Sequence, residues 1–404
     1  MDIDALRRQV PALRQVIYLN TGWAGPRPRP VLDAIVRQME FEAQESPTAP
    51  HVLQQHKDIL AQARAAFARL LGTSPDEIAL TQSTTEGINL ALNGLRLKPG
   101  ERIVTCNLEH PSVLVPCYHL RHTVGVEVEV VQIAPADDSA GVLAKFEAAL
   151  QRPTRLVALS YIAYCTGRRL PLQEICDLAH QRGALVLVDG VQAFGQIPVD
   201  MRTLGCDFYA VGGQKWLLGP DGVGAVYIRR DLLEAVLPTV VGPHAALRHD
   251  AQGAFVPNTS GVNKFDVSTT SIPLWAGLIA AAQLVQGIGL EAIQERIAFL
   301  TRRLRNSLLR VPSLTFTSPA SPADGSGLVA FAVEGVPPKD ITEGIWQRVK
   351  AVGRTVNYPP ATRLCAHAFN TEDEIDWTAQ AVFEVATIAR NKGKAQGPSG
   401  ASQA

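Results

Sequence analysis

The stretch at residues 185–228 decides the fold. It reads LVLVDGVQAFGQIPVD over residues 185–200 and MRTLGCDFYAVGGQKWLLGPDGVGAVYI over residues 201–228. Its first four residues are a continuous apolar run, which is the pattern of a parallel strand buried on both faces. Asp189 follows at the carboxyl end of this strand, the edge where ligands of open α/β sheets collect. Because a buried carboxylate is costly without a cationic partner, Asp189 predicts a ligand that carries positive charge.

A second predicted strand, residues 207–211, leads to a single lysine set among glycines, in the series Gly212-Gly213-Gln214-Lys215-Trp216. Such residues let the backbone approach a ligand closely. A lysine amine in a dry pocket has a lowered pKa, because desolvation disfavours the ammonium, and it becomes a Schiff-base nucleophile. An isolated lysine on a turn is ordinarily a surface residue, but Asp189 upstream favours a functional Lys215. The pair predicts pyridoxal phosphate, with Asp189 at the pyridine nitrogen and Gln192 hydrogen-bonded to the phenolic oxygen of the ring.

A third strand, residues 78–81, is followed by Gln82-Ser83-Thr84-Thr85-Glu86 and a helical pattern of apolar residues. Ser83 and Glu86 have the spacing of a capping box, which explains these residues without any ligand. The amino end of a helix also binds anions through its free N–H groups and its dipole. With Lys215 in the chain, we expect Thr84 and Thr85 to hold the cofactor phosphate.

The series Asp189-Gly190-Val191-Gln192, Gly213-Gln214-Lys215-Trp216 and Gly219-Pro220 resembles the class V aminotransferase family of fold-type I pyridoxal phosphate enzymes. This family includes cysteine desulfurases, cysteine/cystine C–S lyases and isopenicillin N epimerase. The resemblance implies an α/β fold with a mostly parallel-sheet large domain and a smaller α+β C-terminal domain. We expect an N-terminal segment at 1–20 that packs with the small domain, a cofactor-binding large domain at 21–270, a small domain at 271–390 and a flexible tail at 391–404.

The resemblance also assigns roles to single residues. It implies that His110, directly after a glutamate, stacks on the pyridine ring, and that Gln214 donates an amide N–H to the phosphate. Gly22 and Trp23 match a segment that lines the substrate side of the cofactor. Thr269 matches a threonine that reaches the phosphate of the partner subunit, which implies a homodimer with a shared active site.

Two segments bear on the reaction. Tyr164 stands where desulfurases usually carry an asparagine, which changes the shape of the pocket. The ending Arg363-Leu364-Cys365-Ala366-His367 resembles that of the lyase and epimerase branches. Arg363 is expected to hold the substrate α-carboxylate, since a planar guanidinium suits a carboxylate, with Arg354 as second choice or as the partner of a distal carboxylate. The alternative for Arg363 is an exposed side chain paired with the acidic helix that follows.

Composition limits the partners. The 404 residues contain 38 Lys plus Arg and 38 Asp plus Glu, so there is no electrostatic case for nucleic acid or an anionic membrane.

The six cysteines lack a CxxC pair and are expected to be reduced thiols, and the N-terminus lacks the apolar stretch of a signal peptide, so we expect a cytoplasmic protein. The apolar stretch at 272–285 is too short to span a bilayer and predicts a buried helix. No cluster has metal-binding spacing.

The expected function is therefore a pyridoxal phosphate enzyme that binds a small amino acid as an external aldimine, with Lys215 as general base at Cα. C–S bond cleavage of a cysteine- or cystine-like substrate is the preferred reaction. The alternatives are an epimerase or aminotransferase, or a true desulfurase that uses Cys365 as its sulfur acceptor. A catalytically silent cofactor-binding subunit is disfavoured, because such a protein has no need of a Schiff-base lysine.

Overall fold

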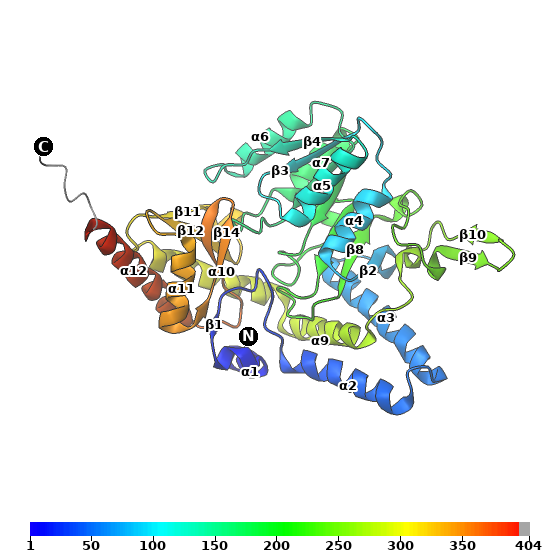
Figure 1. The fold of residues 1–404 in the computed structure, drawn as a ribbon, viewed down its shortest axis with the longest axis horizontal. Helices are drawn as coiled ribbons and strands as arrows, with labels where there is room; N and C mark the ends of the chain where they lie inside the picture. Colours follow the sequence, from blue (N-terminus) through cyan, green and yellow to red (C-terminus); the bar gives the residue numbers. More distant parts are fainter. Residues whose placement is uncertain (396–404) are drawn as a thin grey trace, which may run out of the picture.

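The computed structural model describes residues 1–395, and a seven-stranded, mainly parallel sheet lies at its centre (Figure 1). The pairs β3–β4, β3–β5, β5–β6 and β6–β7 are parallel, and β8 runs antiparallel to β7 and β2. Across the sheet the order is β2 (Ile78–Thr81), β8 (Gly224–Ile228), β7 (Phe208–Gly212), β6 (Leu185–Asp189), β5 (Leu156–Ser160), β3 (Arg102–Cys106) and β4 (Glu127–Val131). The α/β fold class is confirmed, and each strand predicted from the sequence is present.

Both faces of this sheet are covered, which is why its central strands are apolar at every position. Along β6, Leu187 points into one hydrophobic cluster, whereas Val186 and Val188 point into the other. The first cluster packs under α4 (Thr84–Gly94) and α5 (Pro111–Thr123). The second packs under α3 (Pro50–Leu71), α6 (Ser139–Ala149), α7 (Leu172–Gln181), the short α8 (Met201–Leu204) and α9 (Ile272–Ile288). The helix α2 (Arg29–Glu45) lies along α9.

A second, antiparallel sheet forms the core of the smaller body, in the order β11 (Leu314–Phe316), β12 (Leu328–Val333), β15 (Pro360–Cys365) and β14 (Arg354–Asn357). Its helices are α10 (Leu290–Leu308), α11 (Pro338–Val349) and α12 (Glu372–Ala395). The N-terminal segment contains α1 (Ile3–Gln9) and β1 (Ile17–Tyr18), and β1 pairs in parallel with β13 (Ala351–Val352). A hairpin of β9 (Ala246–His249) and β10 (Phe255–Pro257) projects from the large sheet domain (Figure 1).

The packing of α9 bears on the expected domain boundary at residue 271. Trp275, Leu278 and Ala281 lie in the same hydrophobic cluster as the large sheet, because α9 is apolar around most of its circumference. The chain turns at Gly289, whose φ of 92° favours glycine, and α10 then enters the small domain. We therefore propose the boundary at Gly289. The expected flexible tail at 391–404 is wrong for residues 391–395, because α12 continues to Ala395; residues 396–404 lie outside the described part.

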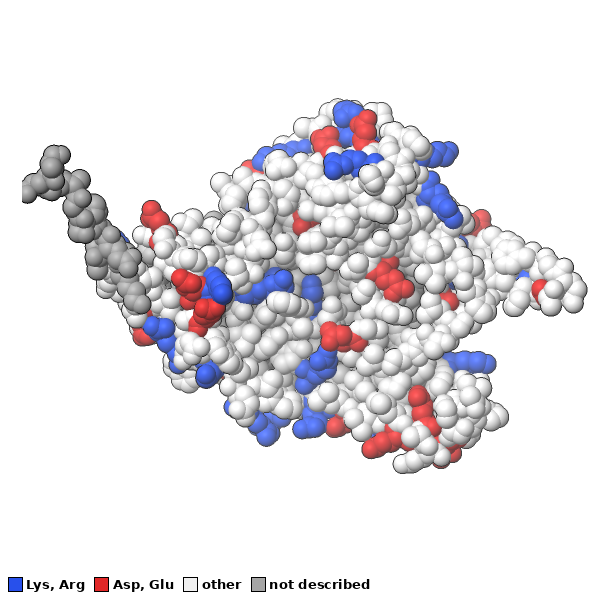
Figure 2. All heavy atoms as spheres, viewed as in Figure 1, with Lys and Arg blue, Asp and Glu red and all other residues white. Residues whose placement is uncertain are grey.

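Charges of both signs are interspersed on the face of the molecule drawn in Figure 2. Within residues 1–395, no single helix is long and apolar enough to cross a membrane, and only the bent pair α9 and α10 passes that test when taken together. All six cysteines are buried and unpaired. In the same part of the chain, no group of three His, Cys, Asp or Glu side chains is arranged to hold a metal ion.

Candidate active site

Asp189 and Lys215 lie at the carboxyl edge of the large sheet: Asp189 is the last residue of β6, and Lys215 is three residues beyond the end of the neighbouring strand β7. Asp189 is 4% exposed, and its Oδ1 accepts a hydrogen bond from Val191 N at 3.1 Å. Burial raises the pKa of Asp189, and the charge of Lys215 opposes that rise. Desolvation lowers the pKa of Lys215 to about 8, and the carboxylate of Asp189 works in the other direction. Each side chain therefore lies within the electrostatic reach of the other, and the amine is partly neutral near physiological pH.

Gly212 lets the side chains of Gln214 and Thr84 approach the backbone closely, near this pair. A Cβ atom on Gly212 would collide with Gln214 Oε1 and lie 2.9 Å from Thr84 Oγ1. The hydroxyl of Thr84 is buried and has no hydrogen-bond partner among the described residues. Buried polar groups are normally paired, so this orphan donor marks a place for an oxygen of a ligand. The location, at the first turn of α4, suits an anion.

The other residues of this helix end differ in exposure and in partners. Thr85 is exposed, and its hydroxyl donates to Ser112 Oγ at 3.0 Å. Ser83 Oγ accepts from Glu86 N at 3.1 Å, which is the first half of a capping box. The second half is shifted by one residue, because the Glu86 carboxylate accepts from Gln82 N at 2.5 Å. The predicted capping box is therefore wrong in this detail, although the helix begins where it was expected.

His110 caps α5 and contacts Tyr164. Its Nδ1 accepts from Ser112 N at 3.1 Å, and its ring meets that of Tyr164 edge-on with centroids 4.9 Å apart. Burial lowers the pKa of His110 to about 4, and the nearby charges of Lys215 and of two arginines add to this. The imidazole is therefore neutral at physiological pH and presents an uncharged aromatic ring.

Gln192 makes two hydrogen bonds within the protein. Its Oε1 accepts from Trp216 Nε1 at 2.9 Å, and its Nε2 donates to Gly22 O at 2.8 Å. The Nε2 group has a second N–H that no hydrogen bond among the described residues uses, so the expected hydrogen bond to the phenolic oxygen of the cofactor stays a prediction. The side chain joins the loop after β6 to Trp216 and to the N-terminal turn.

Two arginines from the small domain face Lys215. Arg354 and Arg363 are directly opposite each other on β14 and β15, and the charge of each contributes to lowering the pKa of Lys215. Arg363 is fully buried; it donates to Tyr164 O at 2.6 Å and to Asn20 Oδ1 at 3.4 Å, and its Nε has no partner among the described residues. Like charges opposite each other on paired strands are destabilising. A bound anion that contacts both guanidinium groups would relieve this repulsion.

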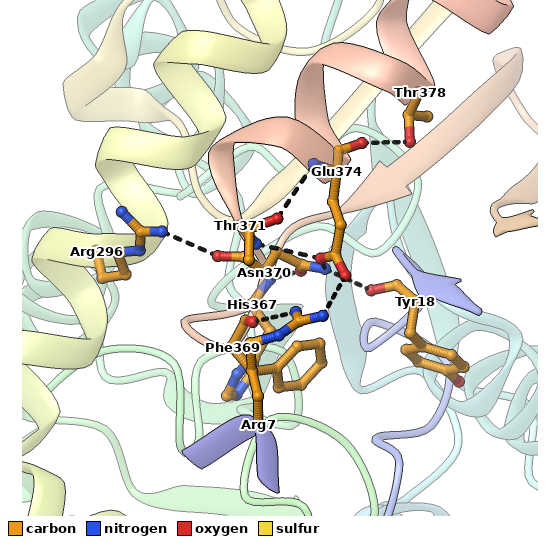
Figure 3. A network of polar contacts seen from close by, with 9 residues as sticks. All are labelled: Arg7, Tyr18, Arg296, His367, Phe369, Asn370, Thr371, Glu374 and Thr378. Carbon is orange, nitrogen blue, oxygen red and sulfur yellow. Dashed lines mark hydrogen bonds and ion pairs between the residues drawn. The ribbon is translucent and has the colours of Figure 1, made fainter. Parts of the chain in front are cut away.

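The acidic helix after Arg363 uses other arginines. Glu374 pairs with Arg7 at 2.7 Å, as Figure 3 shows, and Glu372 pairs with Arg296 at 2.6 Å. The alternative of an exposed Arg363 paired with this helix is therefore wrong, because Arg363 is buried and its partners are neutral oxygens.

The predicted substrate residues Gly22, Trp23 and Arg354 lie around Arg363. A Cβ atom on Gly22 would be 2.9 Å from Cys365 Sγ and 3.3 Å from Arg363 Nη2, so only glycine fits beside these groups. The guanidinium of Arg354 lies 3.9 Å over the ring of Trp23, which is 56% exposed. These residues form a rim at which the pocket meets solvent.

Thr269 lies outside this group. It is exposed and lines a separate groove of about 1210 Å³ with residues of α2 and α3. A role in the active site of the same chain is thus unsupported, and its expected role at a partner subunit stays a prediction.

Sequence reasoning assigned no role to Glu109, the neighbour of His110. It is 2% exposed, and its carboxylate accepts from Ser160 N at 2.9 Å and from Ser160 Oγ at 2.6 Å. Burial raises its pKa to about 7. Glu109 thus ties the segment that carries His110 to the end of β5. The only sequence signal for this role was the position of Glu109 between a strand and His110.

The sequence of the chain matches a known protein family. A family model described as "Aminotransferase class-V" matches residues 17–369. The chain belongs to the class V aminotransferase family. As a member of this family it is a pyridoxal phosphate-dependent enzyme.

Relatives in this family cover nearly the whole chain. A probable cysteine desulfurase of Methanothermobacter thermautotrophicus is 30% identical, over 96% of this chain and 98% of its own. An isopenicillin N epimerase of Streptomyces clavuligerus is 31% identical, over 91% of this chain and 94% of its own. The solved structure of the cystine C–S lyase C-DES with its product cysteine persulfide is 30% identical, with a TM-score of 0.86 over 94% of this chain and 99% of that chain.

The residues present fit the cofactor of this family. Asp189 has a free carboxylate oxygen for a protonated ring nitrogen, Lys215 supplies the amine, and the unpaired hydroxyl of Thr84 supplies a phosphate donor. Gly212, which has no Cβ, allows Gln214 and Thr84 to lie side by side at this helix end. The prediction of pyridoxal phosphate is confirmed at the level of the family, and the individual contacts stay predictions.

Proposed function

We propose that the protein cleaves a C–S bond of a cystine-like amino acid. The observation that carries this proposal is the pair of guanidinium groups of Arg354 and Arg363, which lie beside Lys215 without a carboxylate partner among the described residues. Cystine carries two carboxylates, so one substrate can occupy both arginines. Arg363, the deeper residue, suits the α-carboxylate, and Arg354 at the rim suits the distal one.

The residues around the pocket have separable tasks. Asp189 would hold the cofactor ring, while Thr84, Thr85 and Gln214 would hold its phosphate. Bound pyridoxal phosphate supplies an electron sink for the electron pair left at Cα. Lys215 Nζ takes the Cα proton, for which a pKa of about 8 is well placed. Loss of the β-sulfur from cystine, with uptake of one water, gives cysteine persulfide, pyruvate and ammonia.

Cys365 is poorly suited to carry sulfur. It lies in strand β15, fully buried, and its backbone N–H donates to Leu19 O at 2.7 Å. A sulfur carrier has to move between the substrate and an acceptor, and a buried residue that pairs with a neighbouring strand lacks that freedom. This supports a lyase that releases its persulfide product over a desulfurase that uses Cys365.

We also infer a cytoplasmic homodimer, in which Thr269 reaches the phosphate of the partner subunit. The support is the exposure of Thr269 and the six unpaired cysteines, since disulfides are rare in reducing compartments. Sedimentation of the purified holoenzyme tests the dimer. Loss of cofactor affinity in Thr269→Val, with the dimer intact, tests the shared site.

The cofactor assignment is tested first. The purified protein is expected to be yellow, and borohydride is expected to fix the cofactor on Lys215. Lys215→Ala should abolish this fixation. A colourless protein that takes up no pyridoxal phosphate would overturn the enzyme assignment.

The substrate assignment is tested by comparing cystine with cysteine. Arg354→Met should raise KM for cystine at least about tenfold and leave that for cysteine within about threefold, because a charged hydrogen bond contributes roughly 1.5–3 kcal/mol. Arg363→Lys should impair both substrates. Equal effects of Arg354→Met on the two substrates would contradict a distal carboxylate site.

The reaction type is read from the products. Persulfide and pyruvate in equal amounts are expected from cystine. Exchange of the Cα proton for deuterium without sulfur release would instead indicate an epimerase. If Cys365→Ser abolished sulfur release while leaving cofactor binding intact, the preference for a lyase would be wrong.

A further inference from the structure

A cavity of about 200 Å³ lies between the two domains, and Lys215 is not among its lining residues. From the large domain it is lined by Ile162, Arg169 and Ile197. The small domain contributes one side of α10 and the segment at 318–328. Interfaces between domains are common places for small-molecule sites.

The polar side of this cavity comes from α10. Gln294, Thr301, Arg302 and Arg305 all line it, at positions that share one face of a helix. Within residues 1–395, the side chains of Gln294, Arg302 and Arg305 make no hydrogen bond or ion pair. The hydroxyl oxygen of Thr301 is buried without a partner. The buried hydroxyl of Thr301 is therefore unsatisfied, and beside it the partly exposed Gln294 and Arg305 and the exposed Arg302 have no protein partner within residues 1–395.

The charge of this cavity is positive. Three arginines line it, and no aspartate or glutamate is among its lining residues in the described part of the chain. Arg305 stacks over the ring of Phe316 at 4.1 Å, which fixes the plane of its guanidinium. Burial lowers the pKa of Arg305, with no nearby carboxylate to oppose the effect. By contrast, Arg303 on the same helix pairs with Asp376 at 2.5 Å.

The remaining walls are apolar. Ile162, Ile197, Ile297 and Leu328 line the cavity opposite or beside the arginines. An inorganic ion would leave these side chains without contacts, whereas a ligand with a hydrocarbon body would cover them. We propose that the cavity binds a small organic carboxylate with an apolar body, whose charged group is held by Arg302 and Arg305 and by the hydroxyl of Thr301.

The floor of the cavity connects to the active site. Gln196 Nε2 donates to Gln192 O at 2.6 Å, and Gln196 Oε1 accepts from Gly327 N at 2.7 Å. Gln192 in turn holds Trp216, the neighbour of Lys215. A ligand here touches both domains and the segment that carries Gln192, so its binding stabilises their arrangement.

The proposal is tested by calorimetric titration of the full-length holoenzyme at constant ionic strength. The probes are 4-methylpentanoate and inorganic sulfate. We expect saturable binding of one 4-methylpentanoate per chain, tighter than that of sulfate, with an increase in Tm. Arg305→Met should weaken this binding at least about tenfold, because it removes a charged donor. Thr301→Val, which preserves shape, should weaken it about threefold and covers the case in which Arg305→Met fails to fold.

Two controls separate this cavity from other anion sites. Arg310→Met removes an exposed charge just after α10 and should leave binding within about twofold of wild type. Arg363→Lys, in the active site, should also leave it unchanged. The proposal is overturned if no saturable binding occurs, if sulfate binds more tightly, if Arg310→Met weakens binding as much as Arg305→Met, or if Arg363→Lys abolishes it.

Discussion

The lowered pKa of Lys215 predicts that the apoprotein is destabilised by its own catalytic lysine. The pKa is about 8 in the folded chain and 10.5 in its ordinary state. At about 1.36 kcal/mol per pKa unit, the folded state holds the ammonium at a cost of about 3 kcal/mol. Lys215→Met should therefore stabilise the apoprotein at pH 7 by about this amount.

The stability of the apoprotein should change with pH in a defined direction. Below about pH 8 the lysine is protonated in both states, so the full cost is present. Between about pH 8 and 10.5 the unfolded chain binds the proton and the folded chain does not, so the stability of the wild type rises with pH. The advantage of Lys215→Met over wild type should therefore shrink as the pH rises from 7 to 10.

The assay is urea unfolding of the cofactor-free protein at several pH values, for wild type, Lys215→Met and a control. Lys98→Met replaces an exposed lysine and should show no such trend. A difference between wild type and Lys215→Met that is small at pH 7, or that stays constant up to pH 10, would refute the reasoning that burial lowers the pKa of Lys215.

Three further predictions concern single residues. Thr84→Val should leave the stability of the apoprotein within about 0.5 kcal/mol, because its hydroxyl has no partner, yet weaken cofactor binding about tenfold in a fluorescence titration; unchanged affinity would argue against a phosphate contact. Glu374→Gln should cost about 1–3 kcal/mol in thermal unfolding, because a buried carboxylate holds Arg7 and Asn370 (Figure 3); a loss no larger than that of the more exposed Asp376→Asn would contradict this. The rate of cofactor uptake by the apoprotein, followed by stopped-flow absorbance, should rise about tenfold per pH unit below pH 8 and level off above it, since only the neutral amine of Lys215 reacts; a flat profile would show that the amine is already neutral at pH 7.

Much of the architecture and the core of the active site could be predicted from the sequence. The apolar run before Asp189 and the glycines around Lys215 are local patterns, and a parallel strand ends at the same sheet edge as its neighbour. The order of these residues along the chain was therefore enough to bring the acid and the amine together. Thr84 was predicted from the chemistry of a helix end that follows a strand, whereas the role of His110 came from the resemblance to the family.

Other features depended on contacts between residues far apart in the chain. The hydrogen bonds of Gln192 to Trp216 and Gly22 join three separate segments of the chain. The pairing of Arg354 opposite Arg363 is set by the register of β14 and β15, which no local pattern reveals. The boundary at Gly289 depends on α9 packing under the large sheet.

The sequence by itself determined the sheet, its ligand edge and the identity of the residues that meet there, because these follow from strand order and from the chemistry of an acid, an amine and a helix end. The tertiary structure alone decided which arginines are left without acidic partners. The carboxylates of α12 could have paired with Arg363, but the fold brings Arg7 and Arg296 to them instead. Charge pairing depends on distances across the whole chain, and for that reason both the proposed substrate pocket and the cavity under α10 became visible only in three dimensions.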